Sequence, residues 1–190
     1  MDIPYPVIVE GRYDKNTLSQ VINADIIETR GFGVFKDGEL TALLRALAAK
    51  TKLIVLTDSD GGGVQIRSLL HGILPADRII DLYIPKIEGK ERRKERPSKN
   101  GLLGVEGMDR ETIERIFAPL SGGPPAGKTG YTKADLYGMG LSGGANSGKK
   151  RDAVCVSEGF PTGMTPDAFL SAVNIAGTDL EKYLEKEKKQ

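Results

Sequence analysis

Two kinds of hydrophobic pattern alternate along the first 85 or so residues of the chain. Short, unbroken apolar runs are typical of strands that are buried on both faces of a parallel sheet. Between these runs, apolar residues spaced by three or four predict amphipathic helices, most clearly at 40–47 and 66–73. The order of these elements predicts an α/β fold, with an open, mostly parallel sheet and helices on both faces. The predicted strands are 6–10, 26–29, 52–57 and 79–84.

The pattern changes after the fourth predicted strand. Residues 85–107 are too polar for a core and too long for an ordinary connection, so we interpret them as a functional loop. Residues 121–130 (SGGPPAGKTG) have the composition of a linker. Beyond them, capping residues such as Thr165, followed by Pro166, predict short helices. We therefore expect an α/β domain over 1–120, a linker over 121–130 and a small helical domain over 131–190.

Composition excludes several classes of protein. The chain has 190 residues and a formal net charge of +1, with one Cys and one His. These counts exclude an internal disulfide framework and a Cys/His zinc site. No apolar run approaches the roughly 18 residues that a membrane span needs, and no signal pattern precedes the first predicted strand. We therefore expect a cytoplasmic protein with no membrane partner.

Acidic residues follow two of the predicted strands. Glu10 closes the first strand, and Asp58 and Asp60 follow the third, so all three should lie at the carboxyl edge of the sheet, where ligands bind. Asp14 lies near the start of the first helix. Carboxylates that converge cannot all ionise unless a cation joins them, and oxygen ligands suit Mg²⁺ or Mn²⁺. The alternative interpretation is that these acids are ordinary helix caps and strand ends.

Basic residues are concentrated in three places, although the net charge is close to zero. They border the acids, fill the polar loop and follow a glycine-rich stretch near residue 145. Such residues would bind the phosphates of a nucleic acid. The alternatives are a solubilising loop and, for the arginine on the helix at 66–73, an outward-facing surface residue. The candidates are Arg12, Arg30, Arg67, Lys90, Arg92, Arg93, Lys94, Lys149, Lys150 and Arg151.

Residues 122–129 (GGPPAGKT) formally match a Walker phosphate-binding loop. Such a loop binds phosphate through backbone N–H groups, which Pro124 and Pro125 lack. We therefore expect no ATP binding. We interpret His71 as a surface or packing residue and Cys155 as a small core residue.

Two motifs, VEGRYD at 9–14 and TDSD at 57–60, resemble those of the Toprim domain shared by topoisomerases, primases and some nucleases. More narrowly, further stretches resemble the ribonuclease M-five family of endonucleases, which mature the 5S ribosomal RNA precursor. Together the matching stretches span nearly the whole chain. They are ETRGFG at 28–33, DSDGGGVQIR at 58–67, GKERR at 89–93, LGVEG at 103–107 and LSGG at 141–144.

The resemblance implies a Mg²⁺-dependent endoribonuclease that cleaves double-stranded RNA in precursor 5S rRNA, aided by the 5S-binding ribosomal protein. It assigns catalytic and metal-binding roles to Glu10, Asp58 and Asp60, and Glu10 could instead transfer a proton. It also places Asp14 as a further metal ligand and Glu106 as an accessory acid. It implies that residues 1–120 are a Toprim catalytic domain and that residues 131–190 are a small helical RNA-binding domain. Two alternatives remain: another Toprim nuclease that acts on DNA or on a different RNA, and a non-catalytic RNA-binding ribosome-assembly factor.

Overall fold

The structure, a computed structural model, describes residues 1–30, 38–90, 101–122 and 129–183. The chain divides into two compact units, each considered by itself. The first contains Met1–Gly38 and Lys52–Pro125, and the second contains Glu39–Thr51 and Ala126–Gln190. The first unit thus ends within the stretch that we interpret as a linker.

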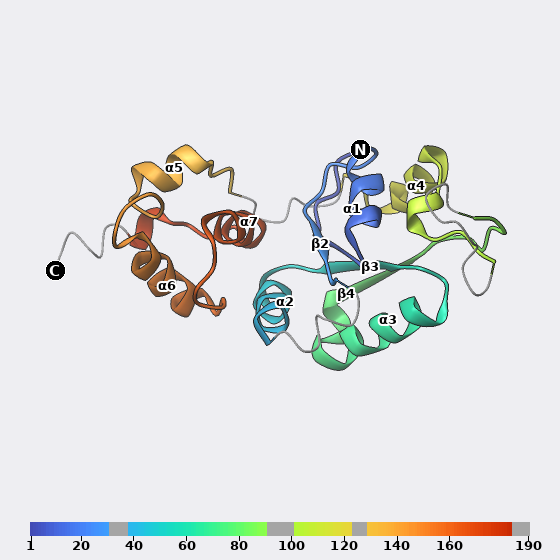
Figure 1. The fold of residues 1–190 in the computed structure, drawn as a ribbon, viewed down its shortest axis with the longest axis horizontal. Helices are drawn as coiled ribbons and strands as arrows, with labels where there is room; N and C mark the ends of the chain where they lie inside the picture. Colours follow the sequence, from blue (N-terminus) through green and yellow to red (C-terminus); the bar gives the residue numbers. More distant parts are fainter. Residues whose placement is uncertain (31–37, 91–100, 123–128, 184–190) are drawn as a thin grey trace. The chain divides into compact units, whose positions relative to one another are not determined.

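The first unit is built on a four-stranded parallel sheet (Figure 1). The strand order is β2-β1-β3-β4, so the first and third strands of the chain lie side by side in the middle. In register, Val7 of β1 pairs with Ile54 of β3, and Thr57 of β3 pairs with Tyr83 of β4. All four strands that the apolar runs predicted are present. They are β1 (Val7–Val9), β2 (Ile26–Glu28), β3 (Leu53–Thr57) and β4 (Ile79–Tyr83).

Helices cover both faces of this sheet. On one face, Val9 and Leu56 pack in one hydrophobic cluster with Leu18 of α1 (Arg12–Ser19) and Phe117 of α4 (Arg110–Phe117). On the other face lies α3 (Gly61–Ile73) (Figure 1). Because strand side chains alternate between faces, the continuous apolar runs supply both cores. The predicted α/β fold class is confirmed. Short 3-10 turns complete the unit at Ala76–Arg78, Val105–Gly107 and Ala118–Leu120.

The second unit is helical. Its helices are α2 (Gly38–Lys50), α5 (Lys133–Gly138), α6 (Ser147–Glu158) and α7 (Pro166–Ala176). The Thr165 hydroxyl accepts a hydrogen bond from the Ala168 N–H, as expected for a cap before Pro166. Cys155 is buried in α6, in agreement with its interpretation as a core residue. Within the described ranges, no helix combines the length and apolarity that a membrane crossing requires.

Helix α2 groups with the C-terminal segment, although it connects two strands of the sheet in sequence. The Lys50 ammonium group lies 5.2 Å from the centroid of the Phe160 ring, just beyond the end of α6. Lys50 also forms an ion pair with Glu158, the last residue of α6. These contacts explain why α2 is part of the helical unit, whereas the sequence pattern grouped it with the sheet.

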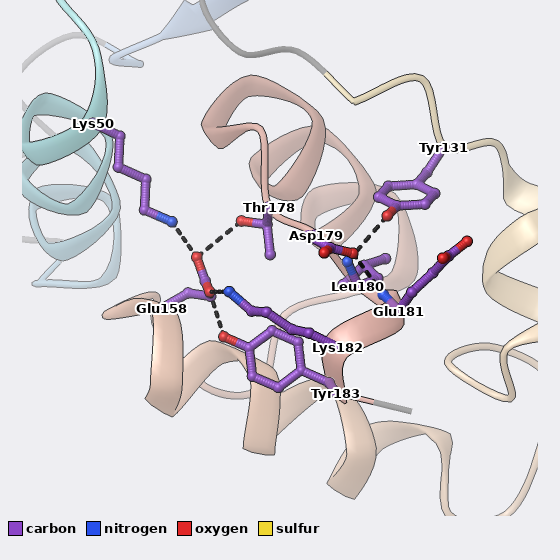
Figure 2. A network of polar contacts seen from close by, with 9 residues as sticks. All are labelled: Lys50, Tyr131, Glu158, Thr178, Asp179, Leu180, Glu181, Lys182 and Tyr183. Atoms are coloured by element: carbon purple, nitrogen blue, oxygen red, sulfur yellow. Dashed lines mark hydrogen bonds and ion pairs between the residues drawn. The ribbon is translucent and has the colours of Figure 1, made fainter. Parts of the chain in front are cut away.

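Glu158 is the centre of a polar network within the second unit (Figure 2). Its side chain is only 7% exposed, and it accepts hydrogen bonds from Lys50, Lys182, Tyr183 and Thr178. Burial alone would raise the pKa of Glu158, but these hydrogen bonds outweigh it and lower the pKa to about 2. The network connects α2, α6 and the segment after α7.

The depressed pKa of Glu158 predicts a pH-dependent stability. A carboxyl that titrates near pH 4.5 when unfolded and near pH 2 when folded stabilises the fold above pH 4.5. That contribution, about 2–3 kcal/mol, is lost as the pH falls from 4.5 toward 2. We expect Glu158→Gln to be less stable than the wild type by this amount at pH 7, and the difference to shrink at pH 3. Urea unfolding at both pH values measures it.

The exposed Glu181 provides the matched control for this prediction. Glu181→Gln should leave the free energy of unfolding within about 0.5 kcal/mol of the wild-type value. The account would be contradicted if the wild type and Glu158→Gln differed in free energy of unfolding by the same amount at pH 3 and at pH 7.

Candidate active site

Glu10 and Asp58 come together because the strands that precede them are parallel neighbours. Glu10 follows β1 directly, Asp58 follows β3 directly, and β1 pairs with β3. The backbone N–H of Asp58 donates a hydrogen bond to Glu10 Oε1 over 3.0 Å. Two carboxylates that are 48 residues apart in sequence therefore share the carboxyl edge of the sheet.

A returning segment holds the Asp58 side chain. The segment around Leu103 lies beside the segment that follows β4, because the Leu103 N–H donates a hydrogen bond to the Ile87 carbonyl over 2.8 Å. Two residues further on, the Val105 N–H donates a hydrogen bond to Asp58 Oδ1 over 2.8 Å. A Cβ at residue 104 would lie 2.7 Å from the same oxygen, so only glycine fits there. Sequence reasoning missed these roles of Gly104 and Val105, and the one signal was the matching stretch LGVEG.

Gly63 provides the same kind of close approach from α3. A Cβ at this position would overlap the Asp58 carbonyl and would lie 2.7 Å from Glu10 Oε1. The first turn of α3 therefore lies directly against the two acids. Within the glycine run at 61–63, the two acids therefore exclude a side chain at Gly63.

Asp14 and Glu106 extend the acidic cluster. Asp14 lies on α1 and is 8% exposed, and its Oδ2 accepts a hydrogen bond from the Gly11 N–H over 3.0 Å. Burial is the main cause that raises the pKa of Asp14 to about 7. The charge of Asp58 raises it further, and the hydrogen bond from Gly11 opposes the rise. Glu10 and Glu106 also raise it. Four carboxyl groups therefore share one electrostatic environment.

Asp60 has a different role in this arrangement. Its Oδ1 accepts a hydrogen bond from the Gly63 N–H over 3.0 Å, so it is the N-cap of α3. This geometry agrees with the alternative interpretation, in which Asp60 is an ordinary helix cap. In the part of the chain that the structure describes, no group of three or more His, Cys, Asp or Glu side chains is arranged to hold a metal ion.

The arginines near the acids differ in their surroundings. Arg12 begins α1 and Arg30 lies just after β2, and both are exposed. Arg67, in contrast, donates hydrogen bonds to the Leu82 and Val55 carbonyls over 2.7 and 3.3 Å. The sequence suggested either a phosphate clamp or an outward-facing residue for Arg67, whereas the structure shows its guanidinium packed against the sheet.

Four of the basic candidates belong to the polar loop after β4. Lys90 is exposed, and Arg92, Arg93 and Lys94 lie outside the described residues. Residues 31–33 of one matching stretch and 123–128 of the Walker-like stretch lie outside them as well.

Three basic candidates belong to α6 of the second unit. Lys149 is exposed and Lys150 is half-buried. Arg151 donates hydrogen bonds to the Leu141 and Met164 carbonyls over 2.7 and 3.2 Å. Arg151 therefore fixes the glycine-rich loop before α6, a structural role that the sequence pattern did not indicate.

The fold and the acids define a class: a parallel α/β domain with carboxylates at the carboxyl ends of adjacent strands. One solved structure, described as a small TOPRIM domain protein from Bacillus stearothermophilus, is similar with a TM-score of 0.45 at 18% identity. The matched region covers 63% of this chain and 90% of the other chain. A search of protein-family models found no match.

Curated relatives are similar over most of the chain. Ribonuclease M5 1 of Ligilactobacillus salivarius is 29% identical over 97% of this chain and 93% of its own length. Ribonuclease M5 of Bacillus subtilis is 28% identical, with 97% and 95% covered. Ribonuclease M5 of Clostridium acetobutylicum is 27% identical, with 94% and 89% covered. The resemblance that the motifs indicated is confirmed: the chain is a homologue of proteins named Ribonuclease M5.

Proposed function

We propose that this chain is a divalent-metal-dependent endoribonuclease that cleaves double-stranded RNA in precursor 5S rRNA and acts in the cytoplasm. The observation that carries the proposal is the contact between Glu10 and Asp58 at the carboxyl edge of the sheet. The similarity to Ribonuclease M5 along nearly the whole chain supports the class of reaction.

The chemistry of these carboxylates suits a hard divalent cation, although the described side chains are not arranged around a metal position. Carboxylate oxygens are the ligands that Mg²⁺ and Mn²⁺ prefer. Burial is the main cause of the raised pKa of Asp14, and the charges of Asp58, Glu10 and Glu106 raise it further. Glu10, Asp58 and Asp60 would hold Mg²⁺, with Mn²⁺ as a substitute, and Asp14 would be a further ligand. When bound, the ion supplies an activated water and neutralises charge at the leaving oxygen.

The chain itself orients the reacting groups. The Asp58 N–H fixes Glu10, and the Val105 N–H fixes Asp58, so the two carboxylates are preorganised. The exposed Arg12 and Arg30 would neutralise the scissile phosphate. The lysines, of which Lys149 is exposed, would supply affinity for the RNA backbone, because duplex RNA is read mostly through sugar–phosphate contacts.

A cleavage assay tests the proposal. Precursor 5S rRNA is incubated with the protein in Mg²⁺ or in EDTA, with and without the 5S-binding ribosomal protein, and the new ends are mapped. We expect cleavage within paired segments in Mg²⁺ and none in EDTA, because the carboxylates act through the bound ion.

Duplex DNA is the matched control substrate and should remain intact. Cleavage of DNA at an equal rate would favour a different Toprim nuclease. Retention of RNA without cleavage in both Mg²⁺ and Mn²⁺ would favour a non-catalytic assembly factor.

A further inference from the structure

An exposed tyrosine ends the edge strand of the sheet. Tyr83 is the last residue of β4 and is 64% exposed. The Arg67 guanidinium lies over its ring, 4.1 Å from the ring centroid. The aromatic ring is therefore backed by a cation, although most of its surface is open to solvent.

The cation behind the ring is fixed. Besides the two carbonyls described above, Arg67 donates to the Thr57 hydroxyl over 3.2 Å and forms an ion pair with Asp81. The second carboxylate oxygen of Asp81 lies 2.8 Å from His71 Nε2. Leaving this position would cost Arg67 several hydrogen bonds, so its guanidinium has a fixed place against the Tyr83 ring.

Tyr83 also lies next to the acidic site along the sheet. It pairs in register with Thr57, the residue directly before Asp58. The Ser59 hydroxyl donates to the Ile84 carbonyl over 3.2 Å, which ties the turn after β3 to the residue after Tyr83. The ring is therefore one strand away from the residues that would act on the scissile phosphate.

We propose that Tyr83 stacks on an unpaired nucleobase of the RNA substrate. Every base has a π-face, and proteins bind unstacked RNA bases on aromatic and arginine planes. The exposed Lys86 lies three residues further along the chain, and the adjoining acids are proposed to act on RNA, so an RNA base is the occupant that we infer. This inference rests on the proposed function and deepens it: the substrate presents an unpaired nucleotide beside the cleaved duplex.

Binding in EDTA, in which no cleavage occurs, tests the inference by fluorescence anisotropy with the full chain. Three labelled RNA duplexes of about 16 base pairs are compared: one fully paired, one with a single unpaired adenosine, and one with an abasic site at that position. We expect the wild type to bind the duplex with the unpaired adenosine about ten-fold more tightly than the other two.

Tyr83→Ala should remove this preference while the affinity for the fully paired duplex stays the same, and Tyr83→Phe should retain it. The unchanged affinity for paired RNA shows that Tyr83→Ala has folded. Tyr137→Ala is the matched control, because Tyr137 is a 71% exposed tyrosine of the second unit, and it should retain the preference.

Equal binding of all three RNAs by the wild type would overturn the inference and leave the proposed function intact, as would a preference that survives in Tyr83→Ala. Binding to none of them would also overturn the inference, whereas the proposed function stands or falls with the cleavage assay on precursor 5S rRNA.

Discussion

Gly63→Ala is expected to reduce RNA cleavage by about 100-fold or more and to lower the free energy of unfolding by about 3 kcal/mol. The new Cβ would overlap the Asp58 carbonyl and would lie 2.7 Å from Glu10 Oε1. Either the first turn of α3 moves outward or the two acids separate, and both changes disturb the site. Steady-state cleavage and urea unfolding measure the two effects.

Helix propensity alone predicts the opposite sign, because alanine stabilises a helix interior relative to glycine by up to about 1 kcal/mol. Gly61→Ala is the matched control, since a Cβ at residue 61 would meet nothing within 4 Å. We expect its stability and cleavage to stay near wild type. A Gly63→Ala protein as active as Gly61→Ala would show that the contacts between α3 and the acids are not needed.

Asp58→Asn is expected to lower cleavage by about 1,000-fold or more while RNA binding persists. The amide keeps the size of the side chain, and its oxygen can still accept the Val105 hydrogen bond. It removes the negative charge that a divalent ion needs. Single-turnover cleavage and RNA affinity, measured on the same preparation, separate catalysis from binding.

Asp60→Asn separates the two interpretations of Asp60. Asparagine is as good an N-cap as aspartate, so the hydrogen bond to the Gly63 N–H can survive. Under the proposed metal role we expect cleavage to be lost as in Asp58→Asn. Full activity in Asp60→Asn would mean that this acid only caps α3.

The apolar runs were sufficient to predict the sheet. A continuous run such as Leu53–Thr57 fits a strand that is buried on both faces, and parallel pairing then brings Glu10 beside Asp58. The helical spacing of α2 was equally clear, but periodicity shows only that a face is buried and not what buries it. The contacts of α2 with Glu158 and Phe160 depend on residues over 100 positions away.

The polar partners were the least predictable part of the site. Arg67 and Arg151 are of the residue type expected at an RNA-binding surface, yet both donate hydrogen bonds to backbone carbonyls. Residue type gives a donor, whereas its acceptor is set by tertiary contacts. The acceptor Asp58 likewise receives its hydrogen bond from a backbone N–H 47 residues away, which no local pattern specifies.

Binding of Mn²⁺, followed by electron paramagnetic resonance, tests most directly whether the clustered acids form a metal centre. Titration of the wild type should show saturable binding that Mg²⁺ displaces, and Asp58→Asn should bind at least ten-fold more weakly. Glu181→Gln, which removes an exposed acid of the second unit, should bind as the wild type does. Equal Mn²⁺ affinity in the wild type and Asp58→Asn would contradict the account.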